Sequence, residues 1–386
     1  MACDKCNNDL TKHPEQIYTP IEGNEIWYTS FDGNIIDEID ALAFSATILS
    51  HTYNDNKGVI TFDSDIYSIL KRAFMPTHAL KTITLPPTLQ NIQRGVFDGC
   101  SNLESVIFNG EITSIGSYAF NNCHSLKEVI GSQSIVLIDD YAFNGCSMLS
   151  NITLGPKINR IGAYGFKDCG SITALELMDF TQVDEGAFNG CRKLEHINIP
   201  ANSKYIRQGT FAFCTSLAKI DIPEGILYIE PHAFYLCSSL REVTLPNGLK
   251  ELEEGAFASS GIESITIPAN ITTIKNDMFS NCYNLNNVVM HDDITLIELN
   301  AFYACHSLKE IRLPASLYYI GDNNFSECIS LTKVYFTSIT PPYLGEQIFY
   351  GTPNTRKLYV PNVALEAYTN SPTWEKYIPY IEGYDI

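Results

Sequence analysis

The sequence predicts a solenoid of short stacked repeats with a parallel β-sheet along one side, and three spacings lead to this fold class. Phenylalanine recurs twelve times at steps of 22 or 23 residues, from Phe74 to Phe325. Cysteine follows ten of these phenylalanines at a spacing of three, and leucine or isoleucine follows eleven at a spacing of six and Phe257 at a spacing of five. A fixed period of this length is the signature of a repeat architecture. The cysteines of the series are Cys100, Cys123, Cys146, Cys169, Cys191, Cys214, Cys237, Cys282, Cys305 and Cys328.

Each repeat opens with a strand. In residues 240–246, Val243 and Leu245 alternate with the polar residues Glu242 and Thr244. This period of two is typical of a half-buried strand. Pro246 follows, and it ends the pairing because it has no backbone N–H.

The rest of the repeat is a return path. In residues 112–126, Ala119, Cys123 and Leu126 have the spacing of one helix face, which predicts a short extended piece followed by one or two helical turns. One such unit cannot bury its own apolar edge. Stacked units can, and we expect their strands to form one parallel sheet.

The N-terminal end is interpreted as a cap. Residues 1–16 are expected to be a flexible tail, and residues 17–56 an N-terminal cap with a β-hairpin. Two β-rich runs flank residues 31–34, whose Asp-Gly-Asn sequence indicates that hairpin. Ala43 and Phe44 imitate the Ala-Phe pair of a repeat, and residues 58–62 are predicted to be the first strand of the solenoid.

The C-terminal end departs from the repeat after Phe336. Residues 57–336 are predicted to form a solenoid of about 12 repeats, and residues 337–386 an atypical repeat and cap. Within this cap, 357–361 is predicted as a last strand and 364–377 as an amphipathic helical segment. Trp27 and Trp374 lie in the two ends. Large aromatic side chains suit the sealing of an open core.

Composition excludes several classes of function. The chain has 386 residues, of which 45% are hydrophobic and 18% charged, so most of it is expected to fold. Its net charge of −19 disfavours nucleic acid and anionic lipid as partners. No apolar run reaches the length of a membrane span. The first residues carry no apolar signal sequence as written.

No catalytic, cofactor or metal motif stands out. The sequence contains no metalloprotease, nucleophile-elbow or phosphate-loop pattern, so we expect no enzyme activity and no cofactor. The repeated cysteines could pair as disulfides. We favour a column of buried free thiols, because parallel side chains do not converge as a disulfide requires and Ser260 replaces one member. His124 and His306 share a position expected in an exposed turn.

The repeat resembles a known family. The unit L-x-x-V/I-x-I/L-P…I-G-x-x-A-F-x-x-C is similar to the BspA-like leucine-rich repeats, and the match runs from about residue 59 to 336. The resemblance implies a leucine-rich-repeat solenoid, an α/β-type right-handed superhelix with a parallel sheet on one face and short extended and helical-turn segments on the other. It also implies a surface or secreted protein of host-associated bacteria, with adhesins among its relatives.

The resemblance gives one meaning to the cysteines near the start. Many bacterial relatives are lipoproteins acylated on their first cysteine, so Cys3 is a candidate lipidation site left after loss of a signal sequence. A plain tail is the alternative. Cys3 and Cys6 lack the second pair that a zinc site needs.

The polar positions of the predicted strands form the candidate binding face. The expected role is non-catalytic binding or adhesion at the cell surface, by a monomer that recognises a protein or a glycan through its solenoid face. A structural spacer presenting another domain is the alternative, and an enzyme site in a terminal cap is a weaker one. Ordinary cross-strand packing also accounts for polar residues here. The candidate residues are Glu176, His196, Asn198, Lys219, Asp221, Glu242 and Thr244.

Overall fold

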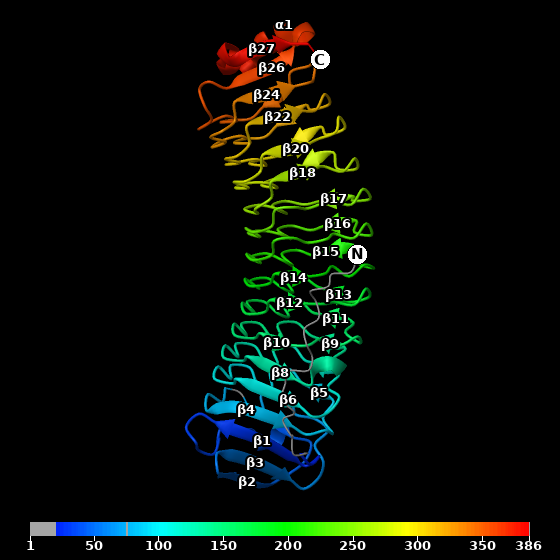
Figure 1. Cartoon of the computed structure of the whole chain (residues 1–386), viewed down its shortest axis with the longest axis vertical. Helices are drawn as coiled ribbons and strands as arrows, with labels where there is room; N and C mark the ends of the chain where they lie inside the picture. The colour runs from blue at the N-terminus through cyan, green and yellow to red at the C-terminus, as the bar shows by residue number, and fades with distance from the viewer. Residues whose placement is uncertain (1–20, 75, 386) are drawn as a thin grey trace, which may run out of the picture.

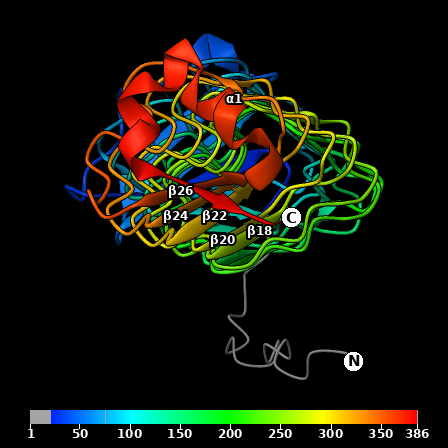
Figure 2. The same cartoon turned by 90° about the horizontal axis from the view of Figure 1, so that it is seen from above.

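The chain forms a long parallel-strand solenoid of about 13 turns, with a cap at each end (Figure 1). The structure is a computed structural model, and it describes residues 21–74 and 76–385. Each turn has three sides, which we call the first ladder, the second ladder and the turn side. Seen from the end, the strands of the first ladder overlie one another along one edge, and the C-terminal helices cover the core (Figure 2). The predicted fold class is therefore confirmed.

The first ladder contains the predicted strands, but these do not form one continuous sheet. It is interrupted near the middle, where β12 and β14 pair over two residues and Lys219 and Glu242 make a single bridge. The amide of Asn198 donates to the carbonyl of Leu177 and accepts from its N–H, so a side chain replaces main-chain pairing at one interruption. The strands are β4 (Leu80–Leu85), β6 (Ser105–Phe108), β8 (Glu128–Ile130), β10 (Asn151–Ile152), β12 (Ala174–Leu175), β14 (His196–Ile197), β18 (Ser264–Thr266), β20 (Asn287–Val289), β22 (Glu310–Leu313), β24 (Lys333–Phe336) and β26 (Lys357–Pro361).

The second ladder is formed by the predicted short extended pieces. Each is a strand of two residues whose second side chain points into the core, as Ile115 and Ile138 do. A 3₁₀ helix, η2 (Ser132–Ser134), precedes one of them. The strands are β5 (Asn91–Ile92), β7 (Ser114–Ile115), β9 (Leu137–Ile138), β11 (Arg160–Ile161), β13 (Gln182–Val183), β15 (Tyr205–Ile206), β16 (Tyr228–Ile229), β17 (Glu251–Leu252), β19 (Thr273–Ile274), β21 (Leu296–Ile297), β23 (Tyr319–Ile320) and β25 (Tyr343–Leu344).

The turn side contains the Ala-Phe-x-x-Cys segments and consists of consecutive turns. The N–H of Phe120 donates to the carbonyl of Ala142 in the next repeat at 2.8 Å, and Cys123 closes a three-residue turn onto Phe120. The residue two positions before each repeat phenylalanine has a positive φ, which prevents the turns from joining into a helix. We call these residues the left-handed column: Arg72, Gly95, Tyr118, Tyr141, Tyr164, Gly186, Gly209, His232, Gly255, Asp277, Asn300, Asn323 and Gln347.

The core is built from columns that run the length of the solenoid. Phenylalanine rings stack from Phe74 to Phe349, with neighbouring centroids between 5.1 and 6.2 Å apart. Offset stacking of this kind adds to the stabilisation from burial. Phe349 extends the column by one repeat beyond the twelve phenylalanines of the sequence pattern.

The cysteine column is made of free thiols. All ten described cysteines are buried and unpaired. Each Sγ–H donates to the carbonyl oxygen of the phenylalanine 25 or 26 residues earlier, at 3.0 to 3.3 Å. Each of these carbonyls also accepts the N–H of the residue three positions later, as Phe120 does from Cys123, so the thiol donates to the second lone pair. A small, largely apolar side chain with a weak donor suits this buried position. Burial raises the pKa of nine of these thiols, to about 12 for Cys100, Cys237 and Cys282.

The N-terminal cap differs from the prediction in its strand pairing. The predicted hairpin at residues 31–34 is wrong, because β1 (Glu25–Ser30) pairs antiparallel with β3 (Lys57–Phe62) on one side and with β4 on the other. Both edges of β1 are therefore filled, and residues 35–39 have no strand to join. The hairpin is formed instead by β2 (Ile48–Asn54) and β3. The predicted first solenoid strand, 58–62, thus belongs to the cap, and the boundary after residue 56 cuts this hairpin.

Two tryptophans were expected to seal the ends, and only one does. Trp27 is half-buried on the face of the cap sheet, where its indole N–H donates to Glu25 and the Lys57 ammonium lies 3.0 Å from the ring centroid. Phe44 seals this end, with its ring 5.8 Å from that of Phe74. Phe44 follows a 3₁₀ helix, η1 (Ala41–Ala43), so Ala43 and Phe44 begin the aromatic column as the sequence indicated.

The C-terminal cap matches its prediction closely. Strand β26 has the predicted bounds, and the helical segment consists of η3 (Asn362–Ala364), α1 (Leu365–Thr369) and η4 (Pro372–Tyr380), followed by β27 (Ile381–Tyr384). Trp374 is fully buried. Its ring lies edge-on to Phe336 at 4.8 Å, and its indole N–H donates to the carbonyl of Pro342. Trp374 therefore covers the last layer of the core.

The thiol column makes a direct prediction about chemical reactivity. Because the thiolate is the reactive form and all ten column cysteines are buried, they should react slowly with a thiol reagent in the native protein. After unfolding without reductant, all twelve cysteines of the chain should titrate. A spectrophotometric thiol assay measures both counts. A shortfall of several pairs after unfolding would contradict the free-thiol column.

Candidate binding faces of the solenoid

The structure exposes all seven candidate binding residues on the outer side of the first ladder. Glu176, His196, Asn198, Lys219, Asp221, Glu242 and Thr244 are each exposed, while the residues between them in the strands point into the core. We call these seven residues the central strand face. They come from four consecutive repeats, so the face is long, and none of the three hollows described below includes any of them.

The side chains of the central strand face differ in how far they are already engaged. Asn198 is bound to the backbone of Leu177 and is therefore the least available to a ligand. Lys219 and Asp221 form an ion pair of 3.3 Å with side chains 67% and 89% exposed. Such exposed pairs contribute little to stability. Within residues 21–74 and 76–385, Glu176 and His196 make no side-chain hydrogen bond or ion pair.

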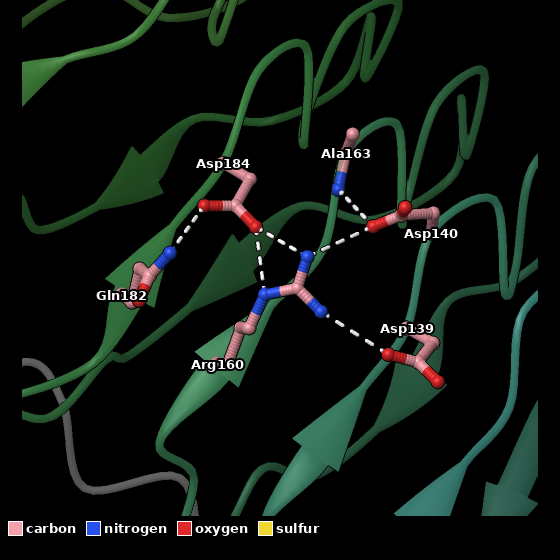
Figure 3. Close-up of polar contacts among 6 residues, drawn as sticks. All are labelled: Asp139, Asp140, Arg160, Ala163, Gln182 and Asp184. Carbon is pink, nitrogen blue, oxygen red and sulfur yellow. Dashed lines mark hydrogen bonds and ion pairs between the residues drawn. The ribbon is translucent and has the colours of Figure 1, made fainter.

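An ion cluster on the second ladder escaped the sequence prediction. Arg160 lies between three aspartates of neighbouring repeats and donates to Asp139 at 3.1 Å, to Asp140 at 3.0 Å and to Asp184 at 2.7 Å (Figure 3). Asp184 also accepts from Gln182, and Asp140 accepts from the Ala163 N–H. The charged groups of this cluster thus find hydrogen-bond partners within the protein, and the cluster joins successive repeats. Spacings of 20 to 24 residues between the partners were the available signal in the sequence.

In the part of the chain that the structure describes, three of the larger hollows lie away from the first ladder, and the sequence analysis predicted none of them. One of about 490 Å³ is lined by Lys71, Arg72 and Arg94, next to the Tyr118 ring. A second, of about 200 Å³, lies by Phe180 and Tyr205 at the second ladder. The third is a hollow of about 540 Å³ on the turn side, and Gly209 is in its floor. We call it the Gly209 hollow.

The two histidines that share one repeat position are not part of a catalytic or metal-binding group among the described residues. His124 is exposed and contacts the carbonyl of Gly145 at 2.8 Å, and His306 stacks on Tyr283. Among the described residues, no three histidine, cysteine, aspartate or glutamate side chains are grouped to hold a metal ion. The part of the chain that the structure describes also contains no helix with the length and hydropathy of a membrane span. Cys3 and Cys6 lie outside the described residues.

Comparison with known proteins identifies the family. A family model described as the BspA type leucine rich repeat region, with six copies, matches residues 37–173, 160–286 and 272–371. The chain belongs to the BspA-type leucine-rich repeat family. A search of curated proteins finds no match to this BspA-type chain. The family is thus identified from the match to the repeat model, which extends from the N-terminal cap into the C-terminal cap.

Solved structures share the BspA-type fold. A leucine-rich repeat protein from Bacteroides ovatus is 21% identical, with a TM-score of 0.58, over 91% of this chain and 100% of that one. A leucine rich cell surface protein from Faecalibacterium prausnitzii is also 21% identical, with a TM-score of 0.50, over 84% of this chain and 86% of the other. At this level of identity the similarity concerns the fold.

Proposed function

We propose that this BspA-type protein is a non-catalytic binding protein that recognises an extended protein or glycan through its central strand face. The observation that supports this proposal is the exposure of seven polar and charged side chains on four consecutive repeats, with charges of both signs. Because the face is shallow, we expect many weak contacts spread along it and no single deep pocket.

We place this activity at the surface of a bacterium, either anchored or secreted. The name of the Faecalibacterium prausnitzii relative, a cell surface protein, supports this location. Acylation of Cys3 would supply an anchor, and metabolic labelling with a fatty acid tests it against a Cys3→Ala variant. We propose that the protein acts as a monomer. The alternative role is a spacer that presents another domain, in which case the central strand face would bind nothing.

The charge pair of this face provides the test of the proposal. A ligand is found first by screening glycans and matrix proteins of a host. Reversal of the pair, Lys219→Glu with Asp221→Lys, should then weaken binding about tenfold, because it exchanges the positions of the two charges that face the ligand. The melting temperature should stay nearly fixed, since exposed substitutions usually change the free energy of unfolding by under about 0.5 kcal/mol.

A matched control exists on the same ladder. Glu310 and Lys333 form a similar exposed pair at 3.7 Å, four repeats further along. The reversal Glu310→Lys with Lys333→Glu should leave binding unchanged. Equal loss in both double variants would indicate a general charge effect, and unchanged binding in the Lys219 variant would place the contact elsewhere. Either result contradicts the central strand face as the binding site.

A further inference from the structure

The left-handed column contains a gap. Tyr118, Tyr141 and Tyr164 stack face to face, with ring centroids 5.0 and 5.1 Å apart. The next two members of the column are Gly186 and Gly209, and the next side chain after them belongs to His232. With repeats spaced by about 4.8 Å, two missing side chains leave an opening on the order of 10 Å along the solenoid.

The gap lies above Gly209. The Tyr164 ring leans over Gly186, where a Cβ atom would collide with it, and His232 leans in the same direction over Gly255. A Cβ atom at Gly209 would meet nothing closer than the Asn189 amide nitrogen, at 3.6 Å. The Gly209 hollow is thus the place that a ring would occupy if the stack of Tyr118, Tyr141 and Tyr164 continued beyond Gly186.

The end of the stack offers an aromatic face to the hollow. One face of Tyr164 is covered by Tyr141, and the other is turned towards Gly186 and the hollow. The ring is held in place because its hydroxyl donates to Glu185 at 2.6 Å, and this bond raises the Tyr164 pKa to about 12. On the opposite side, His232, Tyr235 and Phe213 form an aromatic cluster with edge-on contacts.

The polar side chains that line the Gly209 hollow indicate which class of ligand it would bind. Asn189, Gln208 and Asn281 contribute amides, Ser259 a hydroxyl, and Asp277 a carboxyl group. Amides and hydroxyls both donate and accept hydrogen bonds, as the hydroxyl groups of a sugar do. Among the described residues, those that line the hollow include the carboxyl group of Asp277 and no lysine or arginine, which favours an uncharged ligand over an anionic one. The nearest ammonium group on its aromatic side is that of Lys167, 5.6 Å from the centroid of the Tyr164 ring. An aromatic face bordered by amides fits a hexose ring, which has an apolar C–H face and a polar rim.

We propose that the Gly209 hollow binds an uncharged oligosaccharide, one hexose ring of which stacks on the free face of Tyr164. The ring takes the place that a side chain at Gly209 would occupy in the column. Its hydroxyls bond to the amides of Asn189 and Gln208, and the adjoining sugar reaches Tyr235 and Asn281. This site lies on the turn side, away from the central strand face, and it does not depend on the function proposed for that face.

The test fills the gap with the protein's own side chain. Gly209→Tyr should fold normally, because the same backbone position holds a tyrosine at Tyr164 with a φ of 55°, against 57° at Gly209. The probe is a panel of neutral glucan, mannan and galactan oligosaccharides of two to six residues, measured by calorimetry with the full chain. We expect wild type to bind at least one of them, and Gly209→Tyr to weaken that binding at least tenfold at an unchanged melting temperature.

Two further variants separate stacking from general effects. Tyr164→Ala removes the stacking face and should also weaken binding at least tenfold. Tyr118→Ala removes a ring from the same column, two repeats away from the end of the stack, and should leave affinity unchanged. The proposal is overturned if no oligosaccharide of the panel binds, or if Gly209→Tyr binds as wild type does. The charge reversal at Lys219 and Asp221 should leave sugar binding intact, so the two proposals fail separately.

Discussion

Raising the pH from 8 to about 10.5 should unfold the protein, because the buried thiol column binds protons far more tightly in the native state than in the unfolded one. Burial raises the pKa of nine column cysteines above their usual value of 9.0. A group with a raised native pKa stabilises the fold fully below its unfolded pKa, and this stability is lost as the pH rises towards the native pKa. The window therefore opens near pH 9 and extends to about pH 12.

The size of this effect follows from linkage. At pH 10 the pH exceeds the usual thiol pKa by one unit. Ionisation of each thiol in the unfolded state then favours unfolding by about 1.4 kcal/mol. Nine such groups together amount to on the order of 10 kcal/mol, similar to the whole free energy of unfolding of a typical domain. Urea unfolding in reductant at pH 7, 8, 9 and 10 measures the loss. A free energy of unfolding that stays constant from pH 8 to 10 would contradict the prediction.

Serine variants supply the control for the alkaline effect. Ser260 already occupies a column position in the native chain, with its hydroxyl 3.5 Å from the thiol of Cys282. Cys169→Ser and Cys191→Ser should therefore keep a hydrogen-bond donor and remove an ionisable group. Each should lower the number of protons released on unfolding above pH 9 by about one. An unchanged proton count would assign the alkaline sensitivity to other groups, such as the buried Tyr368.

Deletion of residues 340–386 is the second change with a large expected effect. The deletion removes Phe349 from its stack on Phe325, Trp374 from its contact with Phe336, and β26 from its pairing with β24. The last layer of the core and an open parallel edge would then face water. Exposed edges and apolar ends of a solenoid promote association. We expect aggregation, measured by light scattering and size-exclusion chromatography.

A point substitution tests the role of the C-terminal cap with a smaller change. Trp374→Ala keeps the chain length and removes only the side chain that covers Phe336, so it should cost about 3–5 kcal/mol in the free energy of unfolding. Val363→Ala, at a residue 87% exposed in the same cap, should have almost no effect. A deletion variant that stays monomeric and melts like wild type would show that residues 340–386 are an accessory segment and not a cap.

The repeats, the columns and the C-terminal strand could be predicted because their signals are local. A strand, a buried phenylalanine and a buried cysteine each depend on a position within one 23-residue unit, and twelve copies reinforce the pattern. Pairing in the N-terminal cap could not be predicted in the same way. Whether residues 35–39 or Lys57–Phe62 pair with β1 depends on which edge β4 already fills, and β4 lies about fifty residues away in the chain.

Of the two candidate binding sites, one could be predicted from the sequence and the other could not. Period-two alternation alone indicates that Glu176, Lys219 and Glu242 face outward, and the structure agrees. The Gly209 hollow could not be predicted from the residues in its floor, because a glycine leaves a cavity only where neighbouring side chains do not lean across it. The tyrosine of one repeat covers the glycine of the next, so Gly186 is covered and Gly209 is not. Sequence alone determined the period and the buried columns, whereas the tertiary structure decided where the surface is hollow, because side chains from separate repeats meet only after the turns have stacked.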